Sequence, residues 1–384
     1  MSKHTVQTFL QKRFESYSKN HRLPLYQLKG ISRLSSCRTS SMGGHALYCD
    51  NGHLNGYWYN SCGHRSCPQC GALKREQWLK KVDSFILDTS HHHWVFTLPH
   101  ELHELHEIWR YNRALCQQTL FDSVRKTIQI LSADERFLGA KVGCVLALHT
   151  WTRNLTFHPH IHCLITHGGL SDDGWVEPKK SILFPARVMM KLFRGKFIAA
   201  LRAAMNKGEL NYPDTLSKQD VLNLFNKWGV LDWVVHCAKP YSHGAGVVKY
   251  LARYVRGGAI KNNQIMHVSN KEVRVKYKSH QTKKTEMIRL EPNHFIERIL
   301  SHIAIPKKQQ YHFVGLYHNR CRERLNTARQ YLGQDRIKDM SPLLWREYAE
   351  SKGQIPCCDE CGGKVTVLAR FKVINGEFIF SSKM

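Results

Sequence analysis

Three histidines occupy alternate positions in one short apolar stretch, FHPHIHCLI, which begins at Phe157. Alternation is the period of a β-strand, so the pattern predicts a strand whose His158, His160 and His162 side chains share one face. The intervening apolar residues then face an opposite, packed layer. Imidazole is the commonest metal ligand among side chains, and a sheet face that is otherwise apolar has no other use for three of them in register. The stretch therefore favours a metal-binding face over a face of solvated histidines.

The rest of the chain mixes helix and strand periodicity without a repeating strand–helix–strand order. With 384 residues, the chain is long enough for two or three domains. The clearest patterns are helices at 104–131 and 186–205, a strand at 143–150 just before the histidine strand, and a glycine-bounded helix at 244–258. This mixture predicts an α+β fold rather than a doubly wound parallel sheet.

Basic residues dominate the charge, because 57 Lys and Arg against 30 Asp and Glu give a net charge of +27. An excess of this size predicts a polyanionic partner, with nucleic acid favoured over an anionic membrane surface. We find no apolar run of about 18 residues and no signal peptide, so we expect no membrane partner and an intracellular protein. In a reducing compartment its 13 cysteines are expected to bind metal rather than to form disulfides.

A Cys-x-x-Cys pair, Cys67 and Cys70, lies in the motif CPQCG. Two thiolates at this spacing can bind one zinc ion, and a tetrahedral site needs two more ligands. Cys49 and His53, in CDNGH, supply a second pair, so we predict a structural zinc site made of these four residues. Four further residues nearby leave a second ion or a different set of four open: Cys37, His45, Cys62 and His64.

A second cysteine group, CCDECGG, lies near the C-terminus and contains Cys357, Cys358 and Cys361. It amounts to half of a zinc site, because no second pair of ligands stands beside it in the sequence.

The histidine strand needs a third ligand from elsewhere. His160 and His162 can share one divalent ion, whereas His158 and His162 are four residues apart on a strand, which is about 13 Å. If 143–150 and the histidine strand form an antiparallel hairpin, His149 lies opposite His160 or His162 on the same face. We therefore predict a catalytic metal site of His149, His160 and His162.

The glycine-bounded helix contains KYLARYVRGG, in which Tyr250 and Tyr254 lie one turn apart on one face. Lys249, Arg253 and Arg256 line the adjacent face. Two core aromatics are the alternative reading, but apolar residues already supply a separate face of this helix. A phenolate can attack a phosphodiester and form a covalent link, while the cations hold the flanking phosphates.

A His-hydrophobic-His strand followed by a Tyr-x-x-x-Tyr helix resembles the HUH nucleases. Nearly the whole chain is similar to the two-tyrosine HUH transposases of rolling-circle insertion sequences, the insertion-sequence ninety-one family. The resemblance rests on these stretches: CRTSSMGGH, YNSCGHRSCPQC, FTLPHEL, LHTWTRNLTFHPHIHCLITHGGL, LFPARVMMKLFRGKF, YLARYVRGG and HFIERILSHIAIPK. One departure is CDNGH, where family members usually have Cys-x-x-Cys, so His53 is expected to act as the substitute ligand.

The resemblance implies an HUH catalytic core with a central antiparallel sheet flanked by helices, preceded by a small zinc-binding module. We expect three parts: a zinc-binding DNA-recognition module at 1–75, a nuclease domain at 88–305, and a basic C-terminal region at 306–384.

The resemblance also implies an activity, in which the chain nicks and joins single-stranded or hairpin DNA at element ends through 5′-phosphotyrosine intermediates. Mg²⁺ or Mn²⁺ would be held by His160 and His162, and Zn²⁺ would be structural. No GxxxxGK[ST] motif is present, so strand separation is expected from a host helicase or replication. The expected location is the bacterial cytoplasm, in association with the nucleoid. A plasmid replication initiator or relaxase of the HUH class and a non-catalytic zinc-dependent DNA-binding regulator remain as alternatives.

Overall fold

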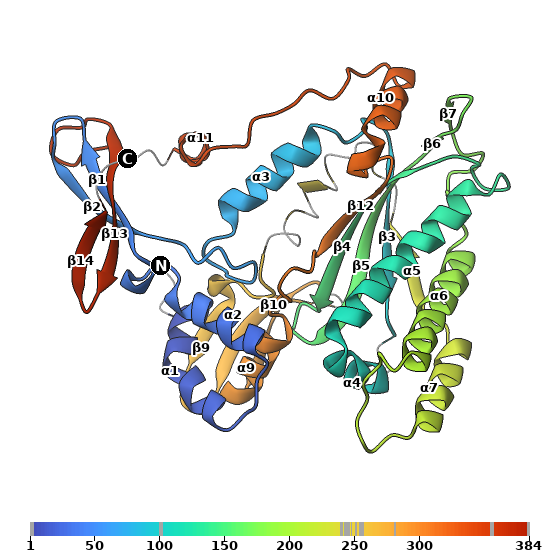
Figure 1. The fold of residues 1–384 in the computed structure, drawn as a ribbon, viewed down its shortest axis with the longest axis horizontal. Coiled ribbons are helices and arrows are strands. Elements are labelled where there is room, and N and C mark those ends of the chain that lie inside the picture. The colour runs from blue at the N-terminus through green and yellow to red at the C-terminus, as the bar shows by residue number, and fades with distance from the viewer. Residues whose placement is uncertain are drawn as a thin grey trace.

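A five-stranded antiparallel sheet forms the centre of the protein (Figure 1), with the strand order β12-β4-β5-β3-β8. Its strands are β3 (His91–Thr97), β4 (Gly143–Trp151), β5 (Phe157–Thr166), β8 (Val234–Cys237) and β12 (Tyr311–Gly315). This computed structural model describes residues 4–99, 103–238, 241, 246, 248–249, 252, 257–279, 282–353 and 357–381. The α+β class and the central antiparallel sheet predicted from the sequence are thus confirmed.

One face of this sheet is covered by four helices, which share one core with it and lie on the right in Figure 1. They are α4 (His103–Tyr111), α5 (Arg113–Ala133), α6 (Ala186–Asn206) and α7 (Lys218–Val230). The alternate apolar residues of the histidine strand, Ile161 and Cys163, are fully buried in this core. Burial of a large apolar side chain stabilises a fold by about 1.5–3 kcal/mol, so this layer fixes which face of β5 the histidines take.

The opposite face of the sheet carries a smaller apolar cluster. Trp78 and Val82 of α3 (Ala72–Asp83) pack there, as do Leu325 and Ala328 of α10 (Arg322–Tyr331). From the sheet itself the cluster takes Val145, Ala147 and Leu164. Because these strand residues alternate with those of the helix-covered face, the histidines of β4 and β5 lie on the α3 side.

A second body combines the N-terminal helices with residues 260–303. The helices α1 (Val6–Lys19) and α2 (Leu25–Ser36) share a buried core with α9 (Pro292–Ser301) and a three-stranded sheet. That sheet has the order β11-β10-β9, with β9 (Ile265–Val268), β10 (Val273–Lys278) and β11 (Thr285–Leu290). The rings of Phe9 and Phe295 meet edge to face at 4.9 Å between centroids.

Local sequence signals set the starts of these helices. The Thr5 hydroxyl accepts a hydrogen bond from the Thr8 backbone N–H at 3.0 Å and so caps α1. Pro292 occupies the first turn of α9, where its missing N–H costs no hydrogen bond. The packing partners of the helices, in contrast, come from distant parts of the chain.

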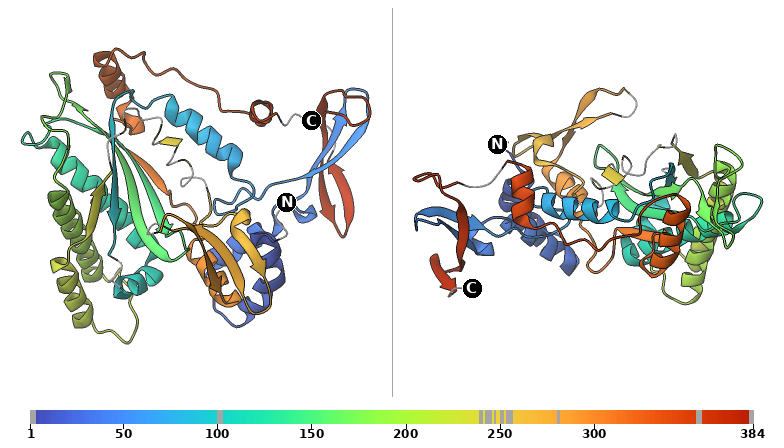
Figure 2. Two further views of the ribbon diagram at one scale, coloured as in Figure 1. Left: turned by 180° about the vertical axis from the view of Figure 1, so that it is seen from behind. Right: turned by 90° about the horizontal axis from the view of Figure 1, so that it is seen from above.

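The first and last strands of the chain form a third, four-stranded sheet with the order β14-β13-β1-β2. Its strands are β1 (Gly44–Cys49), β2 (Leu54–Tyr59), β13 (Val365–Ile374) and β14 (Glu377–Ser381). Figure 2 shows this blue-and-red sheet beside the rest of the molecule, with α11 (Trp345–Ser351) on the way to it. The remaining short elements are η1 (Ser40–Met42), η2 (Asn262–Gln264), η3 (Asn319–Cys321), β6 (Gly169–Leu170) and β7 (Trp175–Val176).

The expected division of the chain at residues 75 and 305 does not follow the packing. Residues 260–303 share a core with the N-terminal helices. Strand β12, beyond residue 305, is an edge strand of the central sheet, and β13 pairs with β1. The sequence texture changes at each predicted boundary, but long-range strand pairing determines which segments pack together. Among the described residues, no helix is both long and apolar enough to cross a lipid bilayer.

Candidate active site and metal centres

The three predicted ligands of the catalytic ion lie together on the sheet. β4 and β5 pair as an antiparallel hairpin in which His149 is directly opposite His160, as the sequence predicted. One ring nitrogen from each of His149, His160 and His162 lies within 4.8 Å of the other two. His158 is not part of this group, although its ring centroid is 5.5 Å from that of His160. The geometry thus selects the hairpin partner over the third histidine of the strand.

The electrostatics of this histidine group favour the neutral imidazole. Burial lowers the pKa of His160 to about 4. Burial also lowers the pKa values of His149 and His162 well below the usual range, and the neighbouring imidazoles lower them further. Neutral imidazole is the form that binds a metal ion, because its unprotonated nitrogen carries the lone pair. The group is therefore ready to bind a divalent cation near neutral pH.

Hydrogen bonds orient two of the three rings. The Nδ1 of His160 lies 2.7 Å from the backbone carbonyl oxygen of His158. The Nδ1 of His162 lies 2.8 Å from Nε2 of His93, a buried residue of the neighbouring strand β3. An imidazole that donates through Nδ1 has its lone pair on Nε2. The carbonyl of His158 can only accept, so His160 takes this form, and His162 takes it when its Nδ1 donates to His93.

His93 is a residue that the sequence reasoning missed. It belongs to the run His91–His93, and its place beside His162 depends on the pairing of β3 with β5, for which the sequence gives no local signal. Its neighbour His92 faces the other way, where its Nε2 contacts Nδ1 of His167. Only one of these two adjacent histidines therefore reaches the metal-binding face.

The tyrosine helix is described only in part. Tyr250, Tyr254, Arg253 and Arg256 lie outside the described residues. Two residues of the same segment, Val248 and Ala252, are fully buried in the apolar cluster on the histidine side of the sheet.

Lys249, the one predicted DNA-binding residue that is described, is exposed and lies near Asp83 of α3. Burial raises the pKa of the Asp83 carboxyl, and the positive charge of Lys249 opposes that rise. The Lys249 ammonium thus lies close to a carboxylate of the helix that covers the histidine side of the sheet.

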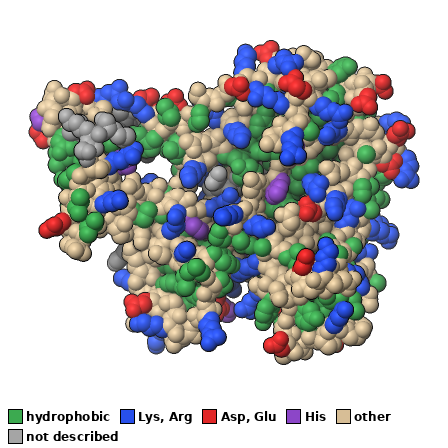
Figure 3. All heavy atoms as spheres, in the orientation of Figure 1, with side chains coloured by type: hydrophobic (Ala, Val, Ile, Leu, Met, Phe, Trp, Pro, Cys, Tyr) green, Lys and Arg blue, Asp and Glu red, His purple; other side chains and the backbone are tan. Residues whose placement is uncertain are grey.

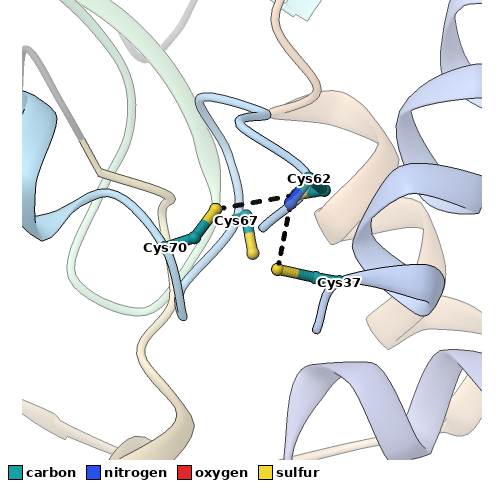
Figure 4. A group of neighbouring side chains, drawn as sticks. All are labelled: Cys37, Cys62, Cys67 and Cys70. Carbon is teal, nitrogen blue, oxygen red and sulfur yellow. Dashed lines mark hydrogen bonds between the residues drawn. The ribbon is translucent and has the colours of Figure 1, made fainter. Parts of the chain in front are cut away.

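The predicted zinc site requires correction, because its four residues belong to two separate groups. Cys67 and Cys70 lie beside Cys37 and Cys62, and the four Sγ atoms are all within 4.8 Å of one another (Figure 4). Cys49 and His53 instead meet Cys358 and Cys361.

The four-cysteine group fits a structural zinc ion. The Sγ atoms of Cys62 and Cys70 are 3.7 Å apart, which is close to the spacing of about 3.8 Å between thiolates bound tetrahedrally at about 2.3 Å. Backbone N–H groups point at the sulfurs: that of Cys62 at Cys37 Sγ (3.5 Å) and that of His64 at Cys62 Sγ (3.4 Å). Such donors stabilise thiolates, the form that binds zinc.

The physical reason for the wrong grouping lies in the strands. Cys37 follows α2 and is buried with Cys62 and Cys67 in the core of the N-terminal helices. Cys49, at the end of β1, is carried away into the terminal sheet. Proximity in sequence therefore failed as a guide to proximity in space. His45 and His64, the other nearby candidates, are in neither group.

Lys and Arg side chains gather in the middle of the face shown in Figure 3, and acidic side chains lie mainly towards its edges. The helix α3, on the histidine side of the sheet, is itself rich in basic residues, with Lys74, Arg75, Lys80 and Lys81. This distribution matches the net charge of +27 and provides a field that attracts polyanions.

Comparison with known proteins agrees with this geometry. Residues 143–324 match the family described as "Putative transposase", and residues 9–98 match the "Transposase zinc-binding domain" of IS91 elements. The chain is 31% identical to the putative transposase y4qJ of Sinorhizobium fredii, over 94% of each chain. It is 28% identical to the transposase for insertion sequence element IS801 of Pseudomonas savastanoi pv. phaseolicola, over 77% of this chain and 71% of the relative.

No solved structure matches the chain. The first family match spans both strands of the histidine hairpin, and the second contains Cys37, Cys62, Cys67 and Cys70. With a relative that is 31% identical along nearly its whole length, these matches show that the chain belongs to the insertion-sequence ninety-one (IS91) family of transposases and has an N-terminal zinc-binding domain.

Proposed function

We propose that the chain nicks and joins single-stranded DNA at the ends of an insertion sequence, with tyrosine as the nucleophile. The observation that carries this proposal is the grouping of His149, His160 and His162 on one face of the sheet. A buried cluster of neutral imidazoles favours an enzyme over a non-catalytic DNA-binding regulator. Membership of a transposase family favours transposition over plasmid replication initiation or relaxation.

The three imidazoles would hold Mg²⁺ or Mn²⁺. When bound, the ion would polarise a non-bridging oxygen of the scissile phosphodiester and so stabilise the charge of the transition state. The chain's own contribution is to keep the imidazoles neutral by burial and to fix their orientation. His93 is a positioning residue in this scheme, since its contact with His162 Nδ1 selects the tautomer with the Nε2 lone pair.

Tyr250 and Tyr254 are the proposed nucleophiles. Val248 and Ala252 of the same segment are buried in the cluster with Ala147 and Leu164, so this segment packs on the histidine side of the sheet. The phenol loses its proton to water, and its oxygen attacks phosphorus while the bond to the 3′-oxygen breaks. The 3′-oxygen takes up a proton and leaves as a 3′-OH, and the 5′-phosphate remains on the tyrosine. Attack by a 3′-OH on this phosphotyrosine reverses the step and joins strands.

Binding of DNA would be shared between charge and the zinc-binding domain. Lys249, Arg253 and Arg256 would hold phosphates beside the cleaved bond, and the zinc-binding domain would recognise single-stranded or hairpin ends. A host helicase or replication would separate the strands, in keeping with the lack of a GxxxxGK[ST] motif in the sequence.

The test is to incubate the full chain with single-stranded element ends and Mn²⁺ and to look for a covalent protein–DNA adduct. We expect an adduct with the unaltered chain and with each of Tyr250→Phe and Tyr254→Phe, and none with the double variant. Tyr331→Phe is the matched control, because this exposed tyrosine lies on α10. An adduct that persists in the double variant would refute the tyrosine assignment, and mapping the modified peptide would identify the residue used instead.

A further inference from the structure

A second group of candidate metal ligands combines residues from both ends of the chain, and the match to the zinc-binding domain covers only half of it. The pair Cys49 and His53 lies in the turn between β1 and β2, and Cys358 and Cys361 lie in a turn just before β13. One ligand atom from each residue lies within 4.8 Å of the other three. The match to the zinc-binding domain ends at residue 98 and so contains only the first pair.

The distances inside this group are those of tetrahedral coordination. Cys361 Sγ is 3.7 Å from Cys49 Sγ, and Cys358 Sγ is 3.6 Å from Nδ1 of His53. Thiolates at about 2.3 Å and an imidazole nitrogen at about 2.0 Å from a tetrahedral zinc ion lie about 3.5–3.8 Å apart. Three sulfurs and one nitrogen make the Cys₃His set that zinc binds in structural sites.

The outer contacts of His53 and the two turns also suit a metal. His53 faces the sulfurs through Nδ1, while its Nε2 is 3.7 Å from a carboxylate oxygen of Glu360. A carboxylate on the far nitrogen of a ligating histidine is the usual outer partner in zinc sites. The N–H of His53 also points at Cys49 Sγ (3.4 Å), and Gly362, at φ +67°, closes the second turn.

The terminal sheet has little else to hold it together. Its own buried cluster consists of Leu47, Cys49, Cys358 and Val365. On one face Tyr57 contacts the rings of Phe371 and Phe378, but Tyr57 and Phe378 remain 41% and 40% exposed. Phe371 and Ala46 add two buried side chains, so the core remains small for four strands from two distant segments, and metal binding can supply further free energy.

We propose that Cys49, His53, Cys358 and Cys361 bind a second structural zinc ion, which fastens the C-terminal segment 357–381 to the N-terminal zinc-binding domain. The C-terminal half site seen in the sequence is completed by ligands about 300 residues away, as the separation of 305 between His53 and Cys358 shows. The proposal does not depend on the chemistry of strand cleavage. It makes the zinc-binding domain a composite of both ends of the chain.

The first test is the zinc content of the purified full chain, measured by mass spectrometry against protein concentration. Every chain in this test carries His149→Ala, which removes the third cation site described above. We expect two zinc ions per chain, and one when Cys358→Ser/Cys361→Ser is added. Cys357→Ser is the matched control, because this adjacent, exposed cysteine is in neither ligand group, and it should retain two ions. One zinc ion in the chain with His149→Ala alone, or two when the double substitution is added, would overturn the proposal.

A second measurement keeps the test decisive if the double variant is poorly folded. With Co²⁺ in place of zinc in the full chain carrying His149→Ala, His53→Cys should retain two ions and shift the visible absorption towards that of a four-thiolate site. Hydrogen exchange in the zinc-loaded double variant should show loss of amide protection in β13 and β14 but not in β4 and β5. Unchanged absorption in His53→Cys, or unchanged protection of β13, would count against a site that includes these ligands.

Discussion

The contact between His93 and His162 leads to a quantitative prediction for metal affinity. His93 is 6% exposed, and its Nε2 is 2.8 Å from His162 Nδ1. His93→Phe keeps an aromatic ring of similar size but removes this acceptor. A buried N–H that loses its acceptor costs about 1–3 kcal/mol. The His162 ring can avoid that cost by moving its proton to Nε2, which blocks the atom that binds the metal.

Metal binding would have to restore the unfavourable tautomer, so the same free energy is lost from metal affinity. A cost of about 1.4–2.7 kcal/mol corresponds to a 10- to 100-fold weaker affinity. We expect the Mn²⁺ concentration for half-maximal adduct formation to rise by about this factor. The amount of adduct at saturating Mn²⁺ should be restored, because His93 orients a ligand and does not contact the DNA in this scheme.

The matched control is His92→Phe, since His92 is the adjacent histidine of the same strand, is equally buried, and contacts His167 on the other side of the sheet. Its Mn²⁺ dependence should stay unchanged. His93→Gln, which retains an acceptor, should lie between the two. An unchanged Mn²⁺ requirement in His93→Phe, or an equal rise in both Phe variants, would show that the His93 contact does not position the metal ligand.

Four further outcomes are expected. His149→Ala should abolish adduct formation while DNA binding persists. His158→Ala should have a milder effect, because of these two histidines only His149 belongs to the group with His160 and His162. The reverse order in the adduct assay would refute the hairpin assignment. Cys67→Ser/Cys70→Ser should lose one zinc ion and lower the melting temperature, measured by elemental analysis and calorimetry, whereas normal folding without zinc would contradict a structural site. Affinity for single strands should fall with salt, with a slope of about −0.7 per phosphate contact for a chain of net charge +27, and a salt-independent affinity would argue against electrostatic binding. Burial lowers the pKa of His302 to about 4. As the pH falls from about 6.5 towards 4, the unfolded chain therefore gains a proton that the native chain excludes, and up to about 3 kcal/mol of stability is lost. His302→Gln should flatten this part of the plot of unfolding free energy against pH.

The relative positions of the three histidines could be predicted because the relevant information is local. The alternation of His160 and His162 defines a strand face, and a short connection to the preceding strand makes a hairpin the simplest pairing. From that hairpin the position of His149 opposite His160 followed, as the structure has it. His93 could not be obtained in this way, because its strand is separated from the hairpin by two helices and its place in the sheet depends on tertiary pairing.

The predicted set of zinc ligands was wrong because it, too, depends on long-range strand pairing. Cys49 and Cys67 are close in sequence, but β1 pairs with β13, and its last residue, Cys49, is opposite Val365. That pairing brings the C-terminal cysteines to the first pair and leaves Cys37 and Cys62 as the partners of Cys67 and Cys70. Spacing rules identify that cysteines bind metal, but strand order decides which of them share an ion.

The loop between β4 and β5 connects the zinc-binding part of the molecule with the histidine site. Leu155, at the tip of this loop, is buried in the core of the N-terminal helices, and the imidazole of His302 bridges the Leu155 carbonyl and the Thr150 hydroxyl at 3.2 and 3.1 Å. Ser66, in the zinc loop, donates a hydrogen bond to the carbonyl of His302 at 3.1 Å. Thr150 is the residue next to His149, so a short chain of direct contacts runs from the Cys67 loop to a proposed metal ligand. Because packed side chains transmit small displacements, the proposed DNA-end contacts of the zinc-binding domain and the proposed site of cleavage belong to one continuously packed structure.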